Sequence, residues 1–290
     1  MSNQITQAFV RQYRTDVEHL LQTDGSVLRP YVMWGTYTGE GGRPVNQIGA
    51  VTAQKVTTRH GDTPYADTPH ASRWVEPQDY EVPADLIDTE DKLRILIDPA
   101  GPYQKSHAMA LGRSIDQEIL DNIFATSKTG PQGGSSEPWN SAYTIAAGGK
   151  SLTVAKMKEA LRLLMAARNR RTDRRIMVIS SQEHDALLNE PQVINGDYSK
   201  EMVLESGMIK RFLGFDIEVL EELQDDGTDR SIPVWVPSGV HCGMWNDVKS
   251  YIDPMPTKRY ATQVYSKATF GATRTQIGKI VEIKCALVPA

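Results

Sequence analysis

The chain has 290 residues, of which 40% are hydrophobic and 23% charged, and this is ordinary for a globular protein that buries a large core. Its formal net charge of -4 argues against a dedicated nucleic-acid binder, because such proteins are usually clearly basic. The chain contains no apolar run of membrane-span length and no apolar signal-peptide core near residue 1, so we expect a protein made in a cytosol without a membrane partner.

The first predicted element is a helix over residues 5–21, where apolar side chains recur at helical spacing. Gly25 follows as a residue that commonly ends a helix. This helix is either the ordinary first helix of the domain or an arm that packs on a neighbouring subunit. The sequence leaves both alternatives open.

A long hairpin is predicted next. Two β-like runs cover residues 47–58 and 71–82, and a tip rich in Gly, Pro and Asp joins them between Arg59 and His70. Threonines stand where a buried face would carry valine or leucine, and a hairpin without an apolar face is not stable alone. We therefore expect the hairpin to lie on its own domain or on a partner.

Two helices follow the hairpin. Residues 103–125 show apolar side chains at spacings near four, which predicts a helix that spans roughly 35 Å at about 1.5 Å per residue. A Gly/Ser/Pro-rich surface segment over residues 129–150 separates it from a second helix over residues 154–167. The residues that this second helix is expected to bury are Met157, Leu161, Leu164 and Met165.

The segment 174–222 has a distinctive order of elements. A buried-looking strand over residues 176–179 leads into a short helix with a capping box, in which Glu183 follows Ser180 by three residues. A polar loop comes next, and then a second strand that starts near Phe215. Beyond it, the predicted strands cover residues 234–236, 243–252, 262–270 and 279–287.

This order of elements resembles that of tailed-bacteriophage major capsid proteins, which share the fold named for phage Hong Kong 97. The segment 174–222 is similar to their axial domain, the helix over 103–125 to their spine helix, and the hairpin to their extended loop. The sequences Asp62-Thr63-Pro64 and Asp67-Thr68-Pro69-His70 look like one subgroup of these proteins.

The resemblance implies an α+β, Hong Kong 97-like capsid fold in four parts. They are an N-terminal arm (1–30), an extended loop (31–85), a peripheral domain with the spine helix (86–175 and 245–290) and an axial domain (176–244). The last strands of the chain would then pack beside the spine helix.

The function implied by the resemblance is that of a major capsid protein. Its copies would assemble in the host cytoplasm, as hexamers and pentamers, into the icosahedral head shell of a virion. The shell would enclose double-stranded DNA, which its inner face contacts non-specifically. Implied partners are a portal, a possible decoration protein and a separate scaffolding protein, since a helix that starts near Ile5 leaves no room for a cleaved N-terminal scaffold.

Two other readings stay open. An encapsulin-like compartment shell shares the fold, although the sequence shows no feature of a cargo-binding groove. An α/β enzyme would need catalytic groups that converge in the fold without a recognisable motif.

Candidate intersubunit contacts lie at and near the hairpin tip. They are Arg59, His60, Asp62, Asp67, His70 and Arg73. Four of these residues are of metal-binding type, but a metal site needs them to converge in space. Salt bridges across a subunit interface are the preferred use, because charges buried at interfaces are usually paired.

A basic cluster follows the second predicted helix. It consists of Arg168, Arg170, Arg171, Arg174 and Arg175. Cations favour the end of a helix because its last carbonyls are unsatisfied, yet five arginines exceed that need. They would face packaged DNA or acidic patches on a neighbour, and the nearby Asp173 with the low overall charge favours the neighbour.

No motif predicts catalysis or a cofactor. Gly149-Lys150-Ser151 precedes a helix, but Thr144 stands where a phosphate-binding loop needs its first glycine. His241 and Cys242 are adjacent, so their side chains would point to opposite faces of a strand. The two cysteines, Cys242 and Cys285, form no CxxC pair. We therefore expect no enzyme activity, no cofactor and no metal.

Overall fold

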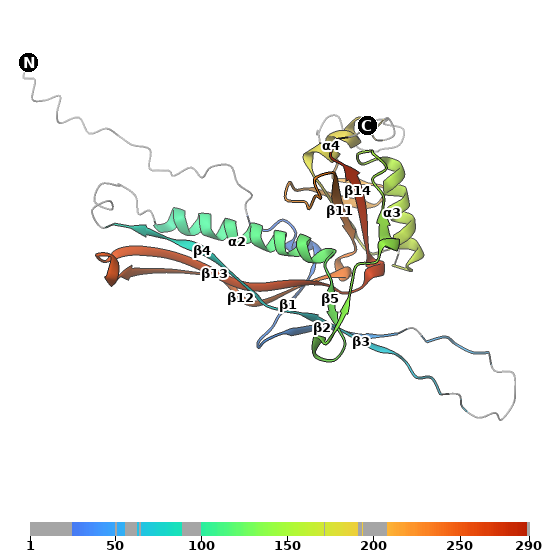
Figure 1. Cartoon of the computed structure of the whole chain (residues 1–290), viewed down its shortest axis with the longest axis horizontal. Helices are drawn as coiled ribbons and strands as arrows, with labels where there is room; N and C mark the ends of the chain where they lie inside the picture. Colours follow the sequence, from blue (N-terminus) through green and yellow to red (C-terminus); the bar gives the residue numbers. More distant parts are fainter. Residues whose placement is uncertain are drawn as a thin grey trace, which may run out of the picture.

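The computed structural model describes residues 25–49, 51–55, 63, 65–88, 100–170, 172–190, 193 and 208–288. Three sheets organise this part of the chain (Figure 1). The predicted helix over residues 5–21 lies outside the described residues. None of the helices in the described part combines the length and the apolarity that a membrane crossing needs.

A long helix lies along a four-stranded sheet (Figure 1). Helix α2 (Ala100–Ile123) has 24 residues, so it is about 36 Å long at 1.5 Å per residue. Its buried apolar residues recur every three or four positions and make one face. The strands, in spatial order, are β1 (Met33–Thr36), β12 (Val240–Met255), β13 (Ala261–Arg274) and β4 (Gln78–Ile87). The predicted long helix and two of the predicted strands are thus confirmed.

A six-stranded sheet forms the second body. Its strands, in spatial order, are β7 (Thr144–Ile145), β14 (Ile280–Ala286), β11 (Asp229–Trp235), β8 (Arg175–Ile179), β10 (Phe215–Val219) and β9 (Arg211–Phe212). Ile176 and Val178 of β8 pack in the cluster that contains the buried face of α2. Met177 and Ile179 pack in a second cluster with residues of α3 (Val154–Ala166) and α4 (Ser181–Leu188). The sheet therefore lies between α2 on one side and these two helices on the other.

The third sheet carries the predicted hairpin. Its strands, in spatial order, are β2 (Gly42–Ile48), β3 (His70–Val75), β5 (Ser127–Thr129) and β6 (Ser135–Glu137). The prediction of one continuous strand over residues 71–82 is wrong, because the chain breaks after Val75 and residues 78–87 pair with β13 instead. Pro77 stands at the break and has no N–H for a ladder.

The last strand was expected beside the spine helix, and this was wrong. β14 pairs with β11 and β7 in the six-stranded sheet. Its residues are almost all buried, as in a strand covered on both faces. Helix α3 also packs on this sheet, although we expected it in the part that contains the spine helix. The domain boundaries as a whole remain a prediction.

The N-terminal caps of α3 and α4 agree with the prediction from the sequence. Thr153 caps α3 by accepting a hydrogen bond from the Lys156 amide, and Ser180 with Glu183 forms the predicted capping box of α4. Met157 and Leu164 are fully buried as predicted. Met165 is 51% exposed because it lies outside the stripe of α3 that meets the sheet.

Candidate assembly surfaces

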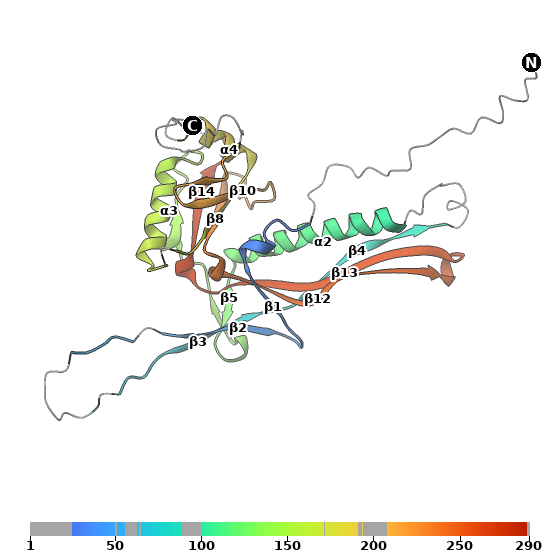
Figure 2. The same cartoon turned by 180° about the vertical axis from the view of Figure 1, so that it is seen from behind.

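The hairpin of β2 and β3 projects away from both larger sheets (Figures 1 and 2). Its root is fixed to the end of β13. Gln47 Nε2 and Arg73 Nε both donate to the Thr275 carbonyl, at 2.7 and 2.8 Å. Arg73 also forms an ion pair with Glu137. These bonds set the direction in which the hairpin leaves the body.

Exposed apolar side chains mark the projecting part of the hairpin. Ile48 is 70% exposed, Val51 61% and Tyr65 98%. Large apolar groups that gather on one projecting element are typical of a contact surface. The described part of their own chain therefore leaves these apolar side chains of the hairpin largely exposed.

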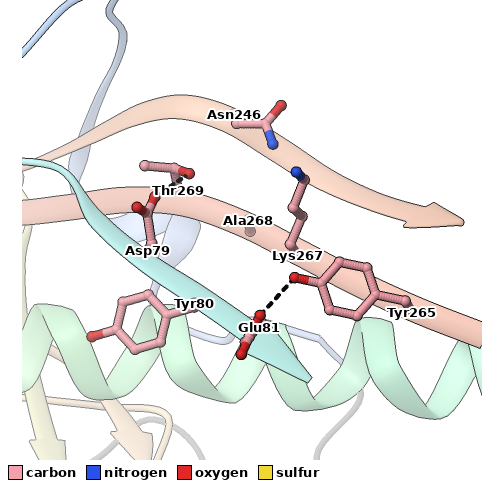
Figure 3. A pocket seen from close by; sticks show the side chains of 8 residues that line it. All are labelled: Asp79, Tyr80, Glu81, Asn246, Tyr265, Lys267, Ala268 and Thr269. Carbon is pink, nitrogen blue, oxygen red and sulfur yellow. Dashed lines mark hydrogen bonds between the residues drawn. The ribbon is translucent and has the colours of Figure 1, made fainter. Parts of the chain in front are cut away.

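The face of the four-stranded sheet opposite α2 is a second candidate surface (Figure 3). It is here called the uncovered face, because none of the helices in the described part of the chain lies on it (Figure 1). Along β13, Val264, Ser266 and Ala268 are buried, while the alternate residues Tyr265 and Lys267 point the other way. A hollow of about 440 Å³ lies on this face, between strands β4, β12 and β13. Its lining is polar, so it suits a hydrogen-bonding partner.

Two carboxylates in this hollow are held by hydroxyl groups (Figure 3). Thr269 Oγ1 donates to Asp79 Oδ1 at 2.7 Å, and Tyr265 Oη donates to Glu81 Oε2 at 2.6 Å. The bond to Glu81 raises the pKa of Tyr265 above its ordinary value. These hydrogen bonds hold the Asp79 and Glu81 carboxylates in fixed positions on the surface of a single subunit.

The chain enters the body at the middle of α2. Asp116, which is 1% exposed, accepts hydrogen bonds from the Ser26 hydroxyl and from the amides of Val27 and Leu28, the last two at 2.8 and 3.0 Å. Burial raises the pKa of Asp116, and these bonds act in the opposite direction. Gly112, one turn earlier, lets the chain cross the helix, because a Cβ there would lie 2.6 Å from the Gly25 carbonyl carbon.

Tyr31 then joins this entering segment to the six-stranded sheet. Its hydroxyl donates to Glu218, and its ring lies under the Arg174 guanidinium at 5.4 Å. The bond to Glu218 raises the pKa of Tyr31. Trp235 Nε1 donates to the Tyr31 carbonyl at 2.9 Å. Residues 26–36 consequently contact α2, the six-stranded sheet and β12 in succession.

A family model of phage capsid proteins matches residues 5–287, which is almost the entire chain. The chain belongs to this family of phage capsid proteins. A comparison with curated proteins finds no match.

Solved capsid structures share the fold of this capsid protein. The capsid of cyanophage P-SCSP1u is 15% identical with a TM-score of 0.71, covering 97% of this chain and 94% of that chain. The capsid of a native GTA particle is 13% identical with a TM-score of 0.72, covering 97% and 96%. The cyanophage Pam1 capsid is 14% identical with a TM-score of 0.70, covering 98% of both chains. The predicted α+β, Hong Kong 97-type fold and the identification as a major capsid protein are confirmed.

Three of the six predicted contact residues of the capsid protein, Asp67, His70 and Arg73, lie in the described part of the chain. Asp67 and His70 are exposed on the hairpin, whereas Arg73 is 9% exposed and bonded within the chain. Arg73 is therefore an anchor of the hairpin root. The other three candidates, Arg59, His60 and Asp62, lie outside the described residues.

The basic cluster of the capsid protein is also divided. Arg168 and Arg170 are exposed in the turn after α3. Arg174 donates to Asp216 Oδ2 at 2.8 Å. Arg175 is 8% exposed at the start of β8, so little of its side chain is available to DNA or to a neighbour. Arg171 lies outside the described residues.

The described residues of the capsid protein hold no group of three metal-ligating side chains. Burial raises the pKa of both Cys242 and Cys285 to about 12, so neither is a thiolate near neutral pH. His241 bonds the Tyr37 hydroxyl at 2.8 Å, and burial lowers its pKa to about 4. These residues pack as ordinary core, in agreement with the sequence.

Sequence reasoning missed Asp116 and Arg274. Asp116 holds the entering chain, and Arg274 donates to three backbone carbonyls near the end of α2, those of Ile123, Ala125 and Glu137. A signal for Asp116 existed, because it stands between apolar residues on the face that α2 buries. No local pattern marks Arg274.

Proposed function

We propose that this capsid protein closes into hexamers and pentamers of its own copies and that these build an icosahedral head shell around double-stranded DNA. The observation that carries the proposal is the hairpin of β2 and β3, which is anchored at its root and projects apolar side chains with no partner in the described residues. Such an element has a use in an assembly and none in a lone subunit.

In this proposal the two larger sheets have different tasks. The six-stranded sheet with α3 and α4 is the axial unit, which gathers around the symmetry axes. The four-stranded sheet with α2 is the peripheral unit. The hairpin of one subunit reaches over a neighbour and lies on its uncovered face, where Asp79, Glu81 and Lys267 offer both signs of charge. Many weak identical contacts then stabilise a closed shell.

The proposed partners are the proteins that a phage head shell needs for assembly. A separate scaffolding protein guides assembly in the host cytoplasm, a portal occupies one vertex, and a decoration protein is an optional addition. The DNA contact is non-specific, consistent with a net charge of -4 that gives no strong attraction to phosphate. The protein carries out no catalysis in this role.

Deletion of residues 59–70 tests the role of the hairpin. The deletion spares the anchors Gln47 and Arg73, so we expect a folded subunit with an unchanged melting temperature. Electron microscopy of the full chain and the deletion, assembled side by side, should show shells for the full chain and few or none for the deletion. An equal yield of shells from both proteins would refute the proposed role.

A further inference from the structure

An exposed pair of arginines lies on one side of the six-stranded sheet, and an exposed group of carboxylates lies on the other. In both views α3 lies on the side of this sheet away from α2 (Figures 1 and 2). The two sides have separate cores, because alternate residues of β8 belong to different clusters. A charge on the α3 side is therefore separated from a charge on the α2 side by the sheet itself.

The α3 side ends in a fixed turn with two free cations, here called the basic turn (Arg168 and Arg170). Asn169 Nδ2, between them, donates to the carbonyls of Leu164 and Gly278 at 2.9 and 2.8 Å. Both arginines are exposed, and within the described residues neither guanidinium has a bonded partner. The turn thus holds two exposed arginines in place, and the charges of Lys279 and Asp173 lie close to Arg170.

The α2 side carries an acidic patch (Asp121, Glu222 and Asp225). Leu220 and Leu223 pack in the cluster of α2, which places this stretch on the α2 side. Gln224 Nε2 donates to Asp121 Oδ1 at 2.7 Å and draws the loop onto the helix. All three carboxylates are exposed. The acidic residues of residues 216–229, a stretch without lysine or arginine, are Asp216, Glu218, Glu221, Glu222, Asp225, Asp226 and Asp229.

We propose that the basic turn of one subunit pairs with the acidic patch of the next subunit around the symmetry axis. The partner is a second copy of this chain, so the inference rests on the proposed function and names the contact within its rings. Complementary charges on opposite sides produce a head-to-tail contact that closes into a ring. Such pairs fix register and suppress wrong contacts more than they add affinity.

Charge reversal on each side tests the pairing. Variant A carries Arg168→Glu and Arg170→Glu, and variant B carries Glu222→Lys and Asp225→Lys. Each alone would oppose like charges in every contact, and we expect a loss of ring and shell yield of about tenfold or more. The variant with all four changes has the wild-type net charge and should recover assembly.

An equimolar mixture of A and B gives a sharper outcome. A is acidic on both sides and B is basic on both sides, so each contact between A and B is complementary. The mixture should therefore form alternating rings with an even number of subunits, and no five-membered rings. Native mass spectrometry of full-length subunits counts the copies in each ring, and thermal melting of the unassembled variants checks that they fold.

Two results would overturn the pairing. They are normal assembly of A or of B alone, and no recovery in the mixture or in the fourfold variant. If A assembles normally but its shells hold less DNA, the basic turn is assigned to DNA. Failure of the wild-type chain to form any ring would instead count against the proposed function.

Discussion

Replacement of Asp116 by alanine should detach residues 26–28 from helix α2. The change removes the acceptor of three hydrogen bonds, and the Leu28 amide, which is buried, then has no partner. An unsatisfied buried donor costs roughly 1–3 kcal/mol, and the relief of a buried carboxylate offsets part of the total. We expect a loss of about 3 kcal/mol in the free energy of unfolding, a large share of the roughly 5–15 kcal/mol typical of a native protein.

The matched control is Asp121→Ala in the same helix. Asp121 is exposed and accepts only side-chain bonds, from Gln117 and Gln224, so its loss should cost less than about 1 kcal/mol. Urea unfolding of the unassembled subunits gives both free energies, and hydrogen exchange at the Leu28 amide reports the local release. Equal stability of the two variants, with Leu28 still protected, would refute the reasoning about Asp116.

Two further predictions concern stability. His241 has a folded pKa of about 4 against an ordinary value of 6.5, so the unfolded chain binds more protons between these values and stability should fall by about 3 kcal/mol as pH drops through that window. In urea unfolding at pH 7, 5.5 and 4, His241→Gln should lose this part of the slope, and an unchanged slope would contradict it. Arg274→Met leaves three carbonyls near the end of α2 without their donor, so it should cost about 3 kcal/mol, and an unaltered melting temperature would exclude that role.

Local chemistry explains which elements were predictable. The long helix α2, the Thr153 cap and the Ser180–Glu183 capping box depend on residues within a few positions of one another. Their patterns are therefore visible in the sequence. The fold class followed from the order of such elements along the chain and not from any single site.

Long-range pairing explains what was missed. β13 and β14 are both strands near the end of the chain, and only their partners, β12 and β11, decide which sheet each one joins. Arg73 and Arg175 were expected at the surface, but both are buried. The sequence alone does not tell whether an arginine binds a neighbouring subunit or a carbonyl of its own chain. The same holds for Arg274, whose acceptors lie more than a hundred residues away.

Electron microscopy of the purified protein, with nucleic-acid content measured on the same fractions, tests whether this chain builds a shell. We expect hexamers, pentamers or closed shells, in the presence of the scaffolding protein if assembly requires it, and DNA inside shells taken from infected cells. Monomers or dimers alone, at every salt and crowding condition and with the scaffolding protein present, would contradict it.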